Sequence, residues 1–209
     1  MLKMNENAGP LRIGVLGMQG AVIEHEGALK RADESIEIVL VRSPDDVKNL
    51  DGLILPGGES TTISINVARG ALLPILQEWI HAGRPTFGTC AGLILMSKPN
   101  MGGFDCTVER NYYGSQSDSF VTTVLHNLKE LGPSSKGVFI RAPAIQEVSD
   151  QVTPLAVIDH IAGQQIVAIQ QGNFLGTTFH PELTTDPTWH RYFLKIAKAY
   201  KKQALEAYQ

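Results

Sequence analysis

Cysteine is scarce in this sequence. Only Cys90 and Cys106 occur among 209 residues, too few for the disulfide framework of a small secreted protein. No stretch approaches the roughly 18 consecutive apolar residues of a membrane-spanning helix. The opening residues, MLKMNENAGP, lack the apolar core of a signal peptide. We therefore expect reduced thiols, no membrane association and a cytoplasmic location.

An excess of charge is also missing. The formal net charge is -3 at pH 7, which gives no electrostatic reason to expect a nucleic-acid partner. Low-complexity tracts and Pro/Ser-rich linkers do not divide the chain. With 43% hydrophobic residues, the chain can bury a substantial core. We expect one domain over residues 1–209, in which residues 1–11 form a flexible extension.

Short apolar runs alternate with helical patterns in the first half, as in βαβ units on a parallel sheet. The predicted strands are residues 12–17, 36–41, 52–58 and 85–88, and the predicted helices are residues 21–32 and 70–83. Residues 155–179 contain three β-type runs, broken at Ala162-Gly163 and Gly172-Asn173, which predicts a meander of hairpins. A closing helix over 186–208 has Asp186 as its expected N-cap. The pattern predicts an α/β fold with a mixed sheet.

Cys90 lies where the fourth predicted strand gives way to a helix. The local sequence Gly88-Thr89-Cys90-Ala91-Gly92 matches the G-x-S-x-G nucleophile elbow with sulfur in place of oxygen. Small flanking residues fit this strained turn, and the N-terminus of the following helix favours a thiolate. A buried structural cysteine is the ordinary role of a free thiol, but the elbow pattern favours a nucleophile.

A thiolate nucleophile needs an imidazole and a carboxylate that orients it. His180 and Glu182, in GTTFHPEL, follow the last strand of the predicted meander, at the kind of sheet edge where α/β active sites assemble. An exposed strand-end turn is the alternative interpretation. The other five histidines are expected to be solvated or satisfied within the fold; they are His25, His81, His126, His160 and His190.

The segment LPGGEST, residues 55–61, follows the third predicted strand. Its adjacent glycines let the backbone approach a ligand and aim an N–H at an oxyanion. A phosphate cradle is disfavoured because the lysine and spacing of the P-loop are missing. The glycines of GVLGMQG have the wrong spacing for a dinucleotide fingerprint. Zinc signatures such as H-E-x-x-H are absent.

Taken together, these motifs resemble those of the class I (triad) glutamine amidotransferases. GMQGAVIEH, LPGGEST, GTCAGLIL, RNYYGSQSDSF, VFIRAP and GTTFHPEL resemble more narrowly the glutaminase subunits of pyridoxal 5′-phosphate synthase, the Pdx2/PdxT family. The resemblance implies a three-layer, flavodoxin-like α/β sandwich with a mixed, mainly parallel sheet. It also implies hydrolysis of L-glutamine, with ammonia passed to a Pdx1/PdxS-type synthase subunit in a heteromeric complex. It implies no metal and no organic cofactor.

The resemblance also implies roles for individual residues. Cys90 is the expected nucleophile, His180 the general base and acid, and Glu182 the carboxylate that orients it. The expected glutamine-binding residues are Gly58, Glu59, Ser60, Arg110, Ile140 and Arg141. The expected oxyanion hole is formed by Gly57, Gly58 and Ala91. Gln19 is placed near that hole and at the interface with the partner.

Bidentate recognition of the α-carboxylate of glutamine would suit the two arginines, although each alone could be a surface ion-pair former. The connection between Asn100 and Gly103 is shorter than in many members of the family, which leaves the contacts on that side of the site open. Another pathway's amidotransferase subunit or a γ-glutamyl hydrolase remains an alternative function. A non-catalytic regulatory module is a further alternative, and it would predict a broken triad.

Overall fold

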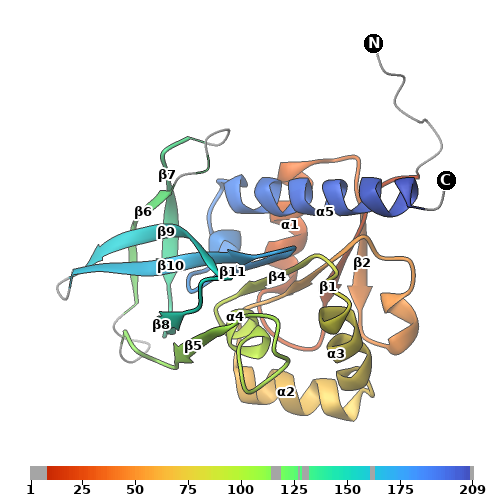
Figure 1. Ribbon diagram of the computed structural model, residues 1–209, viewed down its shortest axis with the longest axis horizontal. Coiled ribbons are helices and arrows are strands. Elements are labelled where there is room, and N and C mark those ends of the chain that lie inside the picture. The colour runs from red at the N-terminus through yellow and green to blue at the C-terminus, as the bar shows by residue number, and fades with distance from the viewer. Residues whose placement is uncertain (1–8, 114–118, 127, 129–131, 161–162, 208–209) are drawn as a thin grey trace.

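The computed structural model describes residues 9–113, 119–126, 128, 132–160 and 163–207. Their main feature is a nine-stranded sheet in the order β2-β1-β3-β4-β11-β10-β9-β6-β7 (Figure 1). The first five strands in this order pair parallel, and the pairs from β11 to β7 are antiparallel. Seven of the nine strands therefore point the same way, and β10 and β6 point the opposite way. The sheet is therefore mixed and mainly parallel, as expected.

The first half of the chain builds the parallel part of this sheet. Its strands are β1 (Arg12–Leu16), β2 (Glu37–Val41), β3 (Gly52–Leu55) and β4 (Thr86–Thr89). The third strand ends three residues earlier than expected, so residues 56–58 belong to a loop at its carboxyl end. Every residue of β3 and β4 is buried, as is usual for parallel strands covered on both faces.

The second half continues the sheet with antiparallel strands. The expected meander is formed by β9 (Thr153–His160), β10 (Gly163–Gln171) and β11 (Phe174–Thr177), although residues 161–162 of its first turn lie outside the described residues. The sequence analysis did not predict β6 (Phe120–His126) and β7 (Ser134–Phe139). It also did not predict the separate pair of β5 (Cys106–Glu109) and β8 (Ala144–Val148). β11 returns to pair parallel with β4, which brings the end of the meander beside the elbow.

Helices cover both faces of the sheet and make three layers (Figure 1). On one face lie α1 (Val22–Ala32) and α5 (Thr188–Glu206), which contact each other. On the other face lie α2 (Ser60–Arg69), α3 (Leu73–His81) and α4 (Ala91–Met96). Each face has its own hydrophobic core, one around Trp79 and Phe104 and the other around Phe87 and Trp189.

Most predicted helices are shifted by one to three residues. The closing helix begins at Thr188 with Pro187 in the N-cap position, so the expectation that Asp186 is the N-cap is wrong by one residue. The Asp186 carboxylate still accepts hydrogen bonds from the backbone N–H and hydroxyl of Thr188, which stabilises the first turn as a cap does. Short 3₁₀ helices occur at Pro44–Val47 (η1) and Pro181–Leu183 (η3). Within the described part of the chain, no helix is long and apolar enough to cross a bilayer.

Candidate active site

The segment at each of four neighbouring strand ends carries an expected site residue. Gln19 follows β1, Gly57 follows β3, Cys90 follows β4, and His180 comes shortly after β11. These strands are adjacent and parallel, so their carboxyl ends meet at one edge of the sheet. Ligands bind at that edge in open α/β sheets.

Cys90 adopts the strained backbone of a nucleophile elbow. Its φ is 47° and its ψ is -103°, between β4 and α4, and such positive φ values are unusual for a residue with a side chain. The Cys90 N–H donates to the Thr177 carbonyl at 2.8 Å, which fixes the turn to β11. A Cβ on Gly92 would lie 1.9 Å from the Leu55 carbonyl oxygen. The flanking glycine is therefore required by close packing against β3, as the elbow pattern predicts.

His180 lies between the Cys90 thiol and a buried carboxylate. Its Nδ1 donates to Glu182 Oε1 at 2.7 Å. Burial disfavours the imidazolium, but the interactions with the nearby Cys90 and Glu182 outweigh this effect and raise the pKa of His180. Burial likewise opposes ionisation of Glu182, yet the neighbouring His25 and His180 lower its pKa overall. The alternative of an exposed strand-end turn is excluded, because His180 is 7% exposed and Glu182 is 3% exposed.

The loop after β3 packs against the elbow and against the Gln19 segment. The Gly57 N–H donates to the Thr89 hydroxyl at 3.0 Å, and its part in the oxyanion hole stays a prediction. Gly58 and Ala91 line the pocket, and Ala91 opens α4, where the first amides have no intrahelical acceptor. Gln19 Oε1 accepts from the Glu59 N–H at 3.0 Å, which ties the Gln19 segment to this loop.

The carboxylate of Glu59 serves a local structural purpose. It accepts from the backbone N–H groups of Thr61 and Thr62 and from the Thr62 hydroxyl, and it thereby caps α2. These hydrogen bonds, led by the Thr62 hydroxyl, lower the pKa of Glu59 to about 2. Glu59 and Ser60 both line the pocket, and their part in binding glutamine stays a prediction.

The two expected arginines form the exposed side of the site. Arg110 follows β5, and Arg141 follows β7 with a positive φ of 45°. Both are exposed and both line the pocket. Within the described ranges neither makes an ion pair, so the structure gives no support to the alternative of surface ion-pair formers.

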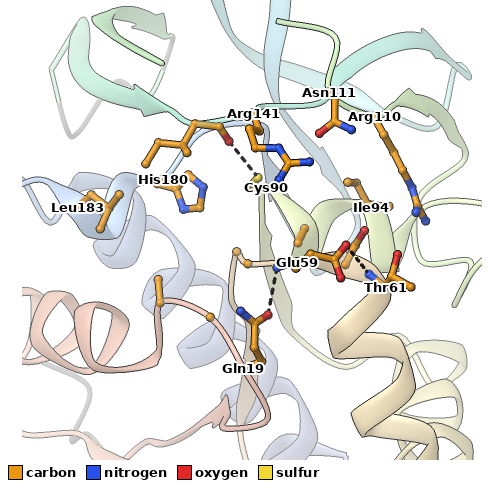
Figure 2. Close-up of a pocket in the computed structure, with 17 residues that line it drawn as sticks. Gln19, Glu59, Thr61, Cys90, Ile94, Arg110, Asn111, Arg141, His180 and Leu183 are labelled. Carbon is orange, nitrogen blue, oxygen red and sulfur yellow. Dashed lines mark hydrogen bonds between the residues drawn. The ribbon is translucent and has the colours of Figure 1, made fainter. Parts of the chain in front are cut away.

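The pocket brings together all the expected residues except Glu182, which lies behind His180. It has a volume of about 570 Å³, within the usual range for small-molecule sites. Figure 2 shows Arg110 and Arg141 entering from one side and Gln19 from the opposite side, with Cys90 and His180 between them. Cys90 Sγ donates a weak hydrogen bond to the Ile140 carbonyl at 4.0 Å. The short connection from Asn100 to Gly103 does not line this pocket.

The sequence analysis missed several residues at the site. Asn111, next to Arg110, lines the pocket with a positive φ of 53°, and its place in the RNYYG motif was the available signal. His25 and His190 are fully buried behind the triad. His25 shares the buried face of α1 with Ala28 and Leu29, and this helical spacing is the signal that could have placed it inside. Residues 114–118 of the same RNYYGSQSDSF motif lie outside the described residues.

Residues 15–199 match the SNO glutamine amidotransferase family, over most of the chain. The chain belongs to the SNO glutamine amidotransferase family. The resemblance inferred from the motifs is confirmed, because similar proteins bear the name "Pyridoxal 5'-phosphate synthase subunit PdxT". The protein of that name from Geobacillus kaustophilus is 46% identical over 198 residues, covering 91% of this chain and 97% of its own length. One from Bacillus mycoides is 41% identical with the same coverage.

Solved structures confirm the fold class. One described as a glutamine amidotransferase has a TM-score of 0.78 and 38% identity, and it covers 89% of this chain and 98% of its own. A glutamine amidotransferase from Thermotoga maritima has a TM-score of 0.62 at 14% identity, with 96% of this chain and 86% of its own covered. The second likeness concerns the fold alone. The α/β sandwich of this chain is thus kept where little of the sequence is shared.

Proposed function

We propose that this chain hydrolyses L-glutamine to L-glutamate and ammonia through Cys90, His180 and Glu182. The observation that carries the proposal is the strained Cys90 backbone at the strand end, with the hydrogen-bonded His180 and Glu182 beside it. Membership in a glutamine amidotransferase family supports the substrate. A regulatory module without catalysis would have no need of an intact buried triad.

The chemistry follows from the charges that this arrangement favours. The raised pKa of His180 and the anionic Glu182 favour an imidazolium, and in the proposed reaction His180 takes the proton of the Cys90 thiol. The thiolate attacks the γ-amide carbon, and the oxyanion accepts hydrogen bonds from the Ala91 and Gly58 amides. His180 gives its proton to the leaving ammonia, and a γ-glutamyl thioester remains on Cys90. His180 then takes a proton from water, which attacks the thioester and releases glutamate.

The exposed arginines complete the proposed glutamine site. A planar guanidinium binds a carboxylate through two parallel hydrogen bonds, so Arg110 and Arg141 are suited to the α-carboxylate. This binding leaves the γ-amide to reach Cys90. Gly58, Glu59, Ser60 and the Ile140 backbone form the rest of the proposed contact surface, since all of them line the same pocket.

We further propose that the ammonia passes to a pyridoxal 5′-phosphate synthase subunit in a heteromeric complex. The names of the similar proteins support this partner. Gln19 is the proposed coupling residue, because it holds the Glu59 amide next to Gly58. A contact with the partner near Gln19 would therefore act on the oxyanion loop. The two free thiols support the expected cytoplasmic location, and we take the chain to be one glutaminase domain.

The proposal is tested by measuring glutamate released from glutamine by the purified chain, with and without the synthase subunit of its source organism. We expect hydrolysis that rises when the subunit is added. Glutamine should also tighten the complex by the same factor by which the partner tightens glutamine binding, and calorimetry with an inactive His180→Asn variant measures this. No hydrolysis in either mixture would contradict the glutaminase assignment. Full activity alone, with glutamine-independent complex affinity, would instead contradict the coupling.

A further inference from the structure

Behind the triad, on the side away from the pocket, lies a buried polar cluster. It consists of His25 from α1, Thr89 at the end of β4, and His190 from α5. All three are 0% exposed, and none of them lines the pocket. The side-chain atoms form a chain: His190 Nε2 is 3.0 Å from His25 Nδ1, and His25 Nε2 is 3.1 Å from Thr89 Oγ1.

This cluster reaches the triad at Glu182. One carboxylate oxygen, Oε1, accepts from His180, whereas Oε2 is buried and has no hydrogen-bond partner among the described residues. His25 Nε2 lies 3.6 Å from Oε2, which is beyond ordinary hydrogen-bond distance. A buried carboxylate oxygen without a donor is costly, so the nearby imidazole N–H is its natural support.

The positions of the hydrogens follow from this contact. If Nε2 of His25 were unprotonated, its lone pair would face the Glu182 carboxylate across 3.6 Å, which is repulsive. We therefore assign the proton to Nε2. Nδ1 of His25 then accepts from the Nε2–H of His190, and His190 Nδ1, which has no partner in the described chain, is a bare acceptor rather than a stranded donor.

His25 is neutral in this arrangement. Burial lowers its pKa, and this effect outweighs the attraction of Glu182 and Glu24, while His180 adds to the lowering. Burial and the proximity of His25 lower the pKa of His190 as well. His25 therefore supports Glu182 with an N–H dipole and adds no second positive charge next to the His180 imidazolium.

The same imidazole also supports the loop after β3. The Thr89 hydroxyl that His25 contacts is the acceptor of the Gly57 N–H. Gly57 packs directly on the His180 ring, because a Cβ there would lie 2.3 Å from His180 Cε1. A single N–H thus sits between the two parts of the site that must stay aligned, the triad carboxylate and the Gly57-Gly58 loop.

We propose that His25 is a positioning residue for glutamine hydrolysis, which holds the second oxygen of Glu182 and, through Thr89, the loop at Gly57. The inference rests on the proposed glutaminase function. His25 touches no substrate, so it acts on the alignment of His180 and of the oxyanion donors. It should therefore influence kcat far more than the binding of glutamine.

Two amide substitutions of His25 distinguish this positioning role from simple packing. In His25→Gln the amide N–H can occupy the place of Nε2 and reach Glu182 and Thr89. In His25→Asn the shorter amide can bond only near the Nδ1 position, toward His190. We expect His25→Asn to lower kcat by about 10-fold, because the Thr89 hydroxyl loses a hydrogen bond and Glu182 loses the nearby N–H dipole, with the KM for glutamine changed by less than about twofold. His25→Gln should restore most of the lost kcat.

Glutamate release is measured for both variants in the complex with the synthase subunit, next to thermal melting of each. An active wild type with an equally active His25→Asn overturns the positioning role. Equal losses in two folded variants overturn it too, because the Nε2 position would then be irrelevant. If His25→Asn does not fold, Thr89→Val against Thr89→Ser gives the same comparison, with a loss of kcat expected only in Thr89→Val. A wild type without glutaminase activity contradicts the proposed function itself, and the positioning role with it.

Discussion

The buried and the exposed sides of the pocket are organised by different physical means. On the buried side, Cys90, His180 and Glu182 are each less than 10% exposed, and a hydrogen bond joins His180 to Glu182. On the other side, Arg110 and Arg141 are exposed and without ion pairs in the described part of the structure. Charges in the buried group interact strongly because water is excluded. The arginines stay hydrated until a ligand arrives.

This difference suggests a division of labour between reaction and binding. The buried side is held in place before glutamine enters, so its substitutions should act mainly on kcat. The exposed side gains its interactions only when the substrate carboxylate arrives, so its substitutions should act on KM as well. Substitutions on each side therefore give a direct way to separate the two roles.

The largest effect is expected for Cys90→Ala. Removing the nucleophile should lower glutamine turnover by about 10³-fold or more, while melting temperature and partner binding stay close to wild type, because alanine keeps the Cβ. Cys106→Ala is the matched control. Burial and the neighbouring Asp105 raise the pKa of the Cys106 thiol to about 11, so this thiol is not activated. Residual turnover above about a tenth of wild type in Cys90→Ala would remove Cys90 from the reaction.

The next largest effect is expected for Gly57→Ala, which tests whether the buried side tolerates a shift of the His180 ring. In Gly57→Ala the new Cβ would lie 2.8 Å from His180 Nδ1 and 3.2 Å from Cys90 Cβ, so the imidazole must move and strain its bond to Glu182. A misplacement of about 1 Å in an active site costs about 100-fold in kcat. Gly27→Ala in α1 is the control, because its Cβ would meet only the flexible end of Arg31 at 3.3 Å. Wild-type kcat in a folded Gly57→Ala would show that the ring position is not critical.

The place of the expected site residues at strand ends could be inferred from the sequence, whereas the contacts that support them could not. Cys90, His180 and Gly57 each follow a short apolar run, so their place at a strand end could be inferred from local pattern. The hydrogen bond from Gly57 to Thr89 depends on how β3 and β4 are aligned. The contact of His25 with Glu182 joins residues that are 157 positions apart (182 minus 25). Such contacts are set by tertiary packing, which no local pattern encodes.

The same reasoning explains which part of the fold was missed. The central parallel strands β3 and β4 are short runs buried on both faces, and such runs are conspicuous in a sequence. In β6 the pattern is weaker, since Val121 is 64% exposed and Leu125 is 41% exposed, so apolar residues occur on its outer face. Pairing with β9 and β7 makes it a strand. Neighbouring strands, more than its own sequence, define this edge of the sheet.

On the exposed side, Arg141→Lys should have a smaller effect than the changes at the triad. Lysine keeps the charge but loses the planar pair of donors, and such a loss is worth roughly 1.5 to 3 kcal/mol, or about 10- to 100-fold in kcat/KM. We expect most of it in KM, with melting unchanged. Arg69→Lys, at the exposed end of α2 and away from the pocket, is the control. Wild-type kinetics in Arg141→Lys would place the carboxylate of glutamine elsewhere.

The smallest effect concerns the stability of the buried side at low pH. Burial, reinforced by His25, lowers the pKa of His190 to about 3, below the value of 6.5 in an unfolded chain. Between these values the unfolded chain binds more protons than the folded one, so stability decreases as the pH falls. His25 acts in the same direction, because its pKa is also lowered by burial. The full contribution of these neutral imidazoles is present above about pH 6.5.

His190→Gln isolates this contribution, because glutamine can still donate to His25 Nδ1 but does not titrate. Between pH 7 and pH 5, His190 accounts for about 2 kcal/mol of lost stability by linkage, and the variant should lose that much less than wild type. Urea unfolding at pH 7, 6 and 5 measures the difference, and each protein serves as its own reference at pH 7. Arg141→Lys changes the exposed side only, so it should follow the wild-type pH dependence. Parallel stability curves for wild type and His190→Gln would mean that His190 is protonated in the fold, and that the buried side is less protected from water than its exposed fractions indicate.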